Sequence, residues 1–133
     1  MLDVSSLLKY STAVKMQKNT IVIKEGAQMP YSMYVILSGT VRVVKNYGEF
    51  NQTIVATLSP GDFFGEMSLF LLKPRSATVI TAEECVILEI NQSNVYEVME
   101  NSPQMLYTIV KTLCVRVDAL NSRVRGDLTI TTP

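Results

Sequence analysis

The chain has 133 residues, with 12 Lys or Arg against 12 Asp or Glu, and it contains no histidine. One domain is expected, because domains usually run to about 100–150 residues. The missing histidine excludes Ser-His-Asp and Cys-His nucleophiles and any histidine-ligated metal site built from this chain. We expect neither an enzyme nor a metal or cofactor. The zero net charge gives no support to the basic field of a dedicated nucleic-acid binder.

The expected location is the cytoplasm. The first six residues lack the basic start and apolar core of a signal peptide. No apolar run approaches the roughly 20 residues that a transmembrane helix needs, so we expect no membrane association. Cys85 and Cys114 do not form a CxxC pair, and we interpret both as buried thiols in a reducing compartment.

Residues 12–90 form a succession of short β-branched runs separated by turns. Ser38 and Gly39 predict a tight corner, and residues 59–62 (SPGD) predict a turn. Short strands with turns every 8–12 residues indicate an antiparallel sandwich, roll or barrel. We expect strands at residues 20–24, 34–37, 40–45, 52–58, 77–81 and 85–90.

After Ile90 the pattern becomes helical, with a short helix expected at residues 94–99 and a longer one opening at Pro103. The longer helix has apolar residues at alternating spacings of four and three, which is a heptad seam. A second apolar face holds Met105, Ile109 and Val115. The helix packs either wholly into its own domain or, as we favour, with its seam against a second copy. The seam residues are Leu106, Val110, Leu113, Val117, Leu120 and Val124.

The chemistry-bearing segment is residues 61–78 (GDFFGEMSLFLLKPRSAT). Gly65 allows backbone to approach a ligand closely, and free amides of Glu66, Met67 and Ser68 would open a short helical turn that attracts an anion. Arg75 offers a fork that suits phosphate, whereas the Glu66 carboxylate suits hydroxyl groups. The pattern therefore indicates a sugar phosphate site. The alternative is an ordinary surface salt bridge between Glu66 and Arg75.

The runs FGEMSL (64–69) and RSAT (75–78) resemble the phosphate-binding cassette of cyclic nucleotide-binding domains. This is the family of bacterial catabolite activator proteins, protein kinase A regulatory subunits and cyclic-nucleotide-gated channels. The resemblance covers about residues 10–125 and includes residues 24–26, 33–39 and 58–66. It implies a mainly β fold in which an antiparallel, jelly-roll-like β-roll (about 12–90) precedes a short helix and a long dimerisation-type helix (about 91–125). The domain would then span residues 1–125, with residues 126–133 as a frayed tail.

The resemblance also implies roles for individual residues. Glu66 would bind the ribose 2′-hydroxyl and Arg75 the cyclic phosphate, with help from backbone amides around Gly65, Met67, Ser68, Ser76 and Ala77. In the bacterial activator a threonine of the long helix contacts adenine, and ungapped alignment places Leu120 there, followed by Asn121. Leucine cannot hydrogen-bond a base but asparagine can, so the choice between cAMP and cGMP stays open.

The resulting hypothesis is a regulatory module that binds a 3′,5′-cyclic nucleotide and relays binding through its C-terminal helix as a homodimer. Only residues 126–133 follow that helix, so we expect no helix-turn-helix and no nucleic-acid binding by this chain alone. One alternative is a ligand-independent dimerisation or scaffold module on the same fold. Another is the sensor half of a transcription regulator that responds to a different anionic effector.

Overall fold

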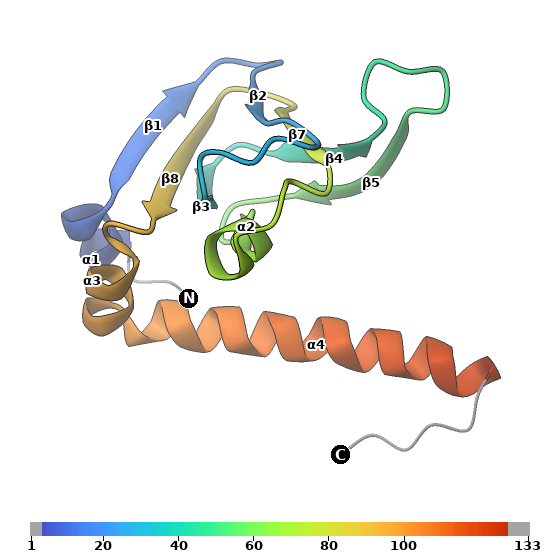
Figure 1. The fold of residues 1–133 in the computed structure, drawn as a ribbon. Coiled ribbons are helices and arrows are strands. Elements are labelled where there is room, and N and C mark those ends of the chain that lie inside the picture. Colours follow the sequence, from blue (N-terminus) through green and yellow to red (C-terminus); the bar gives the residue numbers. More distant parts are fainter. Residues whose placement is uncertain (1–3, 128–133) are drawn as a thin grey trace.

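The computed structural model describes residues 4–127, and its strands form two four-stranded antiparallel sheets (Figure 1). Together these sheets confirm the predicted β-roll. The first sheet has the order β1 (Thr12–Met16), β8 (Cys85–Asn91), β3 (Ser32–Ser38) and β6 (Phe63–Phe64). The second has the order β2 (Ile21–Ile23), β7 (Thr78–Thr81), β4 (Val41–Lys45) and β5 (Thr53–Leu58).

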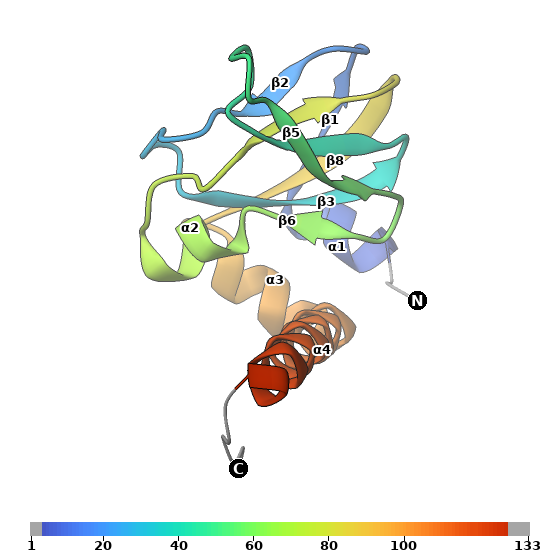
Figure 2. The ribbon, with the colours of Figure 1, turned by 90° about the vertical axis from the view of Figure 1, so that its right-hand side faces the viewer.

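Strand β3 separates two apolar cores because successive side chains of a strand point to opposite faces of its sheet. Tyr34 and Ile36 pack between the two sheets, in a cluster that includes Val79 of β7. Met33 and Val35 point the other way, into a cluster that includes residues of the helices. The molecule therefore has three layers: the second sheet, the first sheet and the helices (Figure 2).

Helices α1 (Val4–Tyr10) and α3 (Val95–Asn101) pack together beneath the first sheet, where Leu7 and Val98 are buried. The short helix α2 (Glu66–Leu71) leaves β6 and lies between the roll and the long helix α4 (Pro103–Asp127) (Figure 1). Helix α3 confirms the predicted short helix. Helix α1 was not predicted, because seven residues are too few to show a period and its place depends on burying Leu7.

Apolar side chains anchor helix α4 to the roll only along its first half. Met105 and Ile109 are buried in the core and Leu113 packs against it, whereas every residue from 114 to 120 is exposed. The predicted second apolar face is therefore wrong at Val115, which is 62% exposed. The expectation that both thiols are buried is wrong at Cys114 and right at Cys85. The physical reason is the same: the helix extends past the sheet that covers its first turns (Figure 1).

The predicted corner between β3 and β4 is confirmed at Gly39, whose φ is +83°. A Cβ atom there would lie 2.4 Å from the carbonyl oxygen of Glu84 and 2.6 Å from Sγ of Cys85. Only glycine fits this corner, because a side chain would meet both backbone and a buried thiol.

The expected tail begins at residue 126, but α4 continues through Asp127. Residues 128–133 lie outside the described part of the chain. Within residues 4–127, no helix has the length and apolar character needed to cross a membrane. The cytoplasmic location stays a prediction.

Candidate functional site

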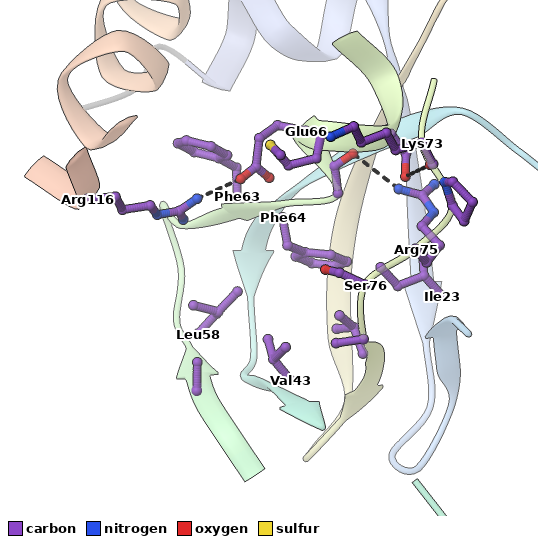
Figure 3. A pocket seen from close by; sticks show the side chains of 17 residues that line it. Ile23, Val43, Leu58, Phe63, Phe64, Glu66, Lys73, Arg75, Ser76 and Arg116 are labelled. Atoms are coloured by element: carbon purple, nitrogen blue, oxygen red, sulfur yellow. Dashed lines mark hydrogen bonds and ion pairs between the residues drawn. The ribbon is translucent and has the colours of Figure 1, made fainter. Parts of the chain in front are cut away.

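A cavity of about 370 Å³ opens between the second sheet and the segment that runs from β6 to β7 (Figure 3). Its size lies within the roughly 300–1,000 Å³ typical of small-molecule sites. One wall is apolar and belongs to the second sheet: Ile23, Val43, Ala56, Leu58 and Val79. The other side carries the charged side chains Glu66, Lys73, Arg75 and Arg116.

Gly65 brings the backbone against the guanidinium of Arg75. It precedes α2 with a φ of +84°, a conformation in which other residues are strained. A Cβ atom at this position would lie 2.8 Å from Nη1 of Arg75 and 2.9 Å from the carbonyl oxygen of Ser32. The backbone at Gly65 thus closely approaches the arginine of the same cassette, and its predicted approach to a ligand stays a prediction.

Arg75 is 4% exposed and is held by backbone carbonyls rather than by a carboxylate. Its Nη1 donates to the Gly65 carbonyl at 3.1 Å and its Nη2 to the Pro30 carbonyl at 2.6 Å. The guanidinium carbon lies 5.9 Å from the ring centroid of Tyr34, which itself stacks on Phe64. Five N–H donors are available to arginine, so this anchored fork retains donors for a ligand in the cavity.

Burial lowers the pKa of the Arg75 guanidinium, while the nearby Tyr34, Glu89 and Glu66 oppose that shift. Arginine stays protonated in proteins, so the cavity holds a positive charge in a desolvated place. An anion that reaches this group gains a charge-assisted hydrogen bond with little competition from water.

Glu66 is 7% exposed at the start of α2, and its partner is a residue of α4. Its Oε1 accepts a hydrogen bond from Nη1 of Arg116 at 2.6 Å (Figure 3). The salt bridge between Glu66 and Arg75 that sequence left open as an alternative is therefore replaced by two different contacts. Both Arg75 and Glu66 line the cavity. Arg75 is held by the carbonyls of Gly65 and Pro30, and Glu66 is held by Arg116 of α4.

Arg116 is a charged residue of the cavity that the sequence did not assign to the site. It lies seven residues after Ile109, so it falls on the same helical face as the buried Met105 and Ile109. Extending the face of Met105 and Ile109 along α4, rather than the heptad seam, predicts that Arg116 faces the roll. Its guanidinium carbon also lies 5.4 Å from the ring centroid of Phe63 in β6.

Seven of the nine predicted site residues line the cavity: Gly65, Glu66, Met67, Ser68, Arg75, Ser76 and Ala77. The hydroxyl of Ser68 donates to the Lys73 carbonyl at 2.8 Å, so this side chain closes the loop after α2. Leu120 and Asn121 are not among the lining residues, and Leu120 is 56% exposed. Binding of a ligand by each of these nine residues stays a prediction.

The arrangement suits an anion next to a hydroxyl-bearing, partly apolar group. The arginine fork and the carboxylate lie on one side of the cavity and the apolar wall on the other (Figure 3). In residues 4–127, no three side chains of His, Cys, Asp or Glu come together as a metal site requires.

Comparison with known proteins gives both sequence and structural relatives. The sequence model of the cyclic nucleotide-binding domain family matches residues 13–102, more than half of the chain. The chain is 32% identical over 94 residues to the potassium channel AKT2 of Oryza sativa subsp. japonica, covering 71% of this chain and 11% of the channel. It is 30% identical over 101 residues to the cAMP-activated global transcriptional regulator Vfr of Pseudomonas aeruginosa, covering 73% of this chain and 47% of the regulator.

The crystal structure of the Thermus thermophilus catabolite activator protein has the same fold, with a TM-score of 0.78 and 22% identity. That match covers 92% of this chain and 57% of the activator chain. The chain thus spans less than half of each of the two sequence relatives above.

Proposed function

Because the chain belongs to the cyclic nucleotide-binding domain family, we propose that it binds a 3′,5′-cyclic nucleotide, cAMP or cGMP, in the cavity of the roll. It acts as a non-enzymatic regulatory module that relays binding through α4. The observation that carries this proposal is the placement of Arg75 and Glu66 in one cavity with an apolar wall.

The charges of the cavity match those of the ligand. Lys73, Arg75 and Arg116 oppose a single carboxylate, Glu66, among the lining residues. A 3′,5′-cyclic phosphate carries one negative charge, which Arg75 receives, and it leaves one free ribose hydroxyl, for which Glu66 supplies an acceptor. The apolar wall of the second sheet suits the faces of the base.

Isothermal titration calorimetry with cAMP and with cGMP tests the proposal. We expect binding by the unaltered chain and a loss of about 2 kcal/mol, near 30-fold in affinity, in Arg75→Ala. Since Arg75 also holds the carbonyls of Gly65 and Pro30, Arg75→Lys provides a second variant that keeps the charge but not the fork.

The matched control is Arg42→Ala, which removes an exposed arginine of β4 outside the cavity and is expected to leave affinity unchanged. Melting curves establish that each variant is folded. Failure of the unaltered chain to bind either nucleotide at high micromolar concentration would refute the proposal. Equal affinity in all three variants would place the ligand away from Arg75.

The relay depends on the ion pair between Glu66 and Arg116, which ties the cavity to α4 at 2.6 Å. A ligand hydroxyl that bonds Glu66 meets a group already attached to this helix. Ligand binding then favours one arrangement of α4 over others, which is the thermodynamic requirement for transmitting a signal.

The exposed seam of α4 supports a homodimer as the unit that receives this signal. Leu106, Val110, Val117 and Leu120 are each 46–56% exposed, and Leu113 is partly buried against the core. The side chain of Val124, the last residue of the predicted seam, lies outside the described residues. A helix with a half-exposed apolar stripe gains free energy when a second such stripe covers it.

Two alternative functions can be distinguished from this proposal by experiment. A ligand-independent scaffold would use the same seam, and its dimerisation would ignore cyclic nucleotides. A sensor for another anionic effector would use Arg75 without need of a ribose acceptor. Binding of a 2′-deoxy cyclic nucleotide as tightly as the ribose form would favour that second alternative, because Glu66 would then contribute nothing.

A further inference from the structure

Tyr34 belongs to a row of side chains that crosses the first sheet next to the arginine of the cavity. It is paired with Phe64 of β6 on one side and with Glu89 of β8 on the other. Residues directly opposite one another on neighbouring antiparallel strands project from the same face of the sheet. The three side chains therefore point into the space between the two sheets, where the guanidinium carbon of Arg75 lies 5.9 Å from the centroid of the Tyr34 ring.

The Tyr34 ring is fixed by both neighbours in this row. It is buried and stacks on Phe64 with 5.2 Å between the ring centroids, and its hydroxyl donates to Oε2 of Glu89 at 3.4 Å. Burial raises the pKa of the phenol and the charge of Glu89 raises it further, against the opposing effect of Arg75. The phenol therefore stays protonated at neutral pH and keeps a proton to donate to the carboxylate.

Arg75 and Glu89 have opposite charges and contact the same side chain, yet they do not pair. The guanidinium is bonded to backbone carbonyls and the partly buried carboxylate to the phenol. Among the residues that the structure describes, the ion pairs within 4.0 Å involve neither of these two groups. Burial lowers the pKa of Arg75 and the charge of Glu89 acts against that shift, so the carboxylate is near enough for its charge to reach the guanidinium.

A direct pair between Glu89 and Arg75 would compete with an anionic ligand. An arginine that is already paired with a carboxylate has fewer donors for a phosphate, and part of its charge is neutralised. The phenol of Tyr34 is neutral, so it occupies the carboxylate without neutralising the arginine. Its ring also attracts the guanidinium through a cation–π contact.

We propose that Tyr34 is a positioning residue of the anion site: its hydroxyl retains Glu89 and its ring supports Arg75, which leaves the guanidinium charge available to the phosphate of the ligand. This inference rests on the function proposed above. It gives a role in binding to a buried tyrosine that does not itself line the cavity.

Calorimetric titration of cAMP and of cGMP against Tyr34→Phe, Glu89→Gln and the double variant tests this role. Tyr34→Phe keeps the ring but releases the carboxylate toward Arg75, so we expect about tenfold weaker binding of both nucleotides. Glu89→Gln removes the competing charge and is expected to bind no more weakly than the unaltered chain. The double variant is expected to recover an affinity within about threefold of the unaltered chain.

The recovery separates release of Glu89 from a purely structural loss, because removing a carboxylate does not repair a loosened core. Tyr107→Phe is the matched control: it removes the hydroxyl of a 68% exposed tyrosine of α4 outside the cavity and is expected to keep the affinity. Melting curves establish that each variant is folded. In ¹H–¹⁵N spectra of the ligand-free proteins, we expect the Nε–H resonance of Arg75 to shift in Tyr34→Phe and to return in the double variant.

Unweakened binding by Tyr34→Phe, weaker binding by Glu89→Gln, or a double variant as weak as Tyr34→Phe would each overturn the role of Tyr34 while leaving the proposed function intact. An equal loss of affinity in Tyr107→Phe would overturn it as well, since the effect would not depend on Glu89. Absence of binding by both nucleotides to the unaltered, folded chain would instead overturn the proposed function and this inference together.

Discussion

At the scale of single residues, the cassette depends on a contact between backbone and a cation. The guanidinium of Arg75 is ordered without a ligand, because the carbonyls of Gly65 and Pro30 hold it in place. Gly65 supplies one of those carbonyls and leaves the space that the guanidinium occupies. Preorganisation of this kind lowers the entropic cost of binding, since the side chain is already ordered.

Gly65→Ala is therefore expected to weaken both stability and ligand affinity. The positive φ alone costs a non-glycine residue about 1–2 kcal/mol, and the added Cβ atom also displaces Arg75 or the Ser32 carbonyl. Gly48→Ala is the matched control, because Gly48 has a φ of +86° with nothing within 4 Å of an added Cβ atom. Urea unfolding and calorimetry of both variants separate the two effects. If Gly65→Ala costs no more than Gly48→Ala and binds normally, the contact with Arg75 is unimportant.

At the scale of elements, the strands with β-branched runs could be predicted, and the shortest elements could not. Strand β6 has two residues, Phe63 and Phe64, and its pairing with β3 depends on the turn before it and on Gly65 after it. Neither its existence nor that of α1 follows from local pattern, because each needs tertiary packing to form. The lining residues Gly65, Glu66 and Arg75 were predictable because one contiguous segment carries them.

Helix α4 shows why the rest of the site was harder to predict. Its heptad spacing is regular enough to dominate the pattern. Leu120 and Asn121 were expected as base contacts from ungapped alignment with the bacterial activator, which does not show which helical face meets the roll. The face that meets the roll is a different one, and its cavity residue, Arg116, is charged. Which face of a helix covers a cavity depends on the angle at which the helix leaves α3, and the sequence pattern does not contain that angle.

The seam of α4 yields a prediction that a single charge tests. Val117→Lys places an ammonium group in the proposed interface from each copy, and losing the burial of the half-exposed Val117 in both copies costs roughly 2 kcal/mol in total, about 30-fold in dimer affinity. Val115→Lys is the control, since Val115 is equally apolar and 62% exposed but points about 200° around the helix from Val117. Sedimentation velocity over a range of concentrations measures both variants. Equal dimerisation of the two would exclude the seam as the interface.

At the scale of the whole molecule, the cavity and the long helix belong to different layers that touch at few points. The first half of α4 is part of the core through Met105 and Ile109, and its second half meets the roll through Arg116. Segments with few buried apolar contacts open more readily than the core. Among the residues whose side chains are described, those from 114 to 123 are therefore the part of α4 that a ligand in the cavity can most easily order.

Hydrogen exchange with and without cyclic nucleotide tests that coupling directly. We expect amides of α2 and of the second half of α4 to exchange more slowly with ligand, by up to about 100-fold at a concentration 100 times the dissociation constant. Residues 46–52, the turn that joins β4 to β5 and projects away from α4 (Figure 1), are expected to change little. If exchange slows only at residues that line the cavity and not in α4, then the roll binds its ligand without any coupling to the helix. The ion pair between Glu66 and Arg116 would then be a structural contact rather than a link.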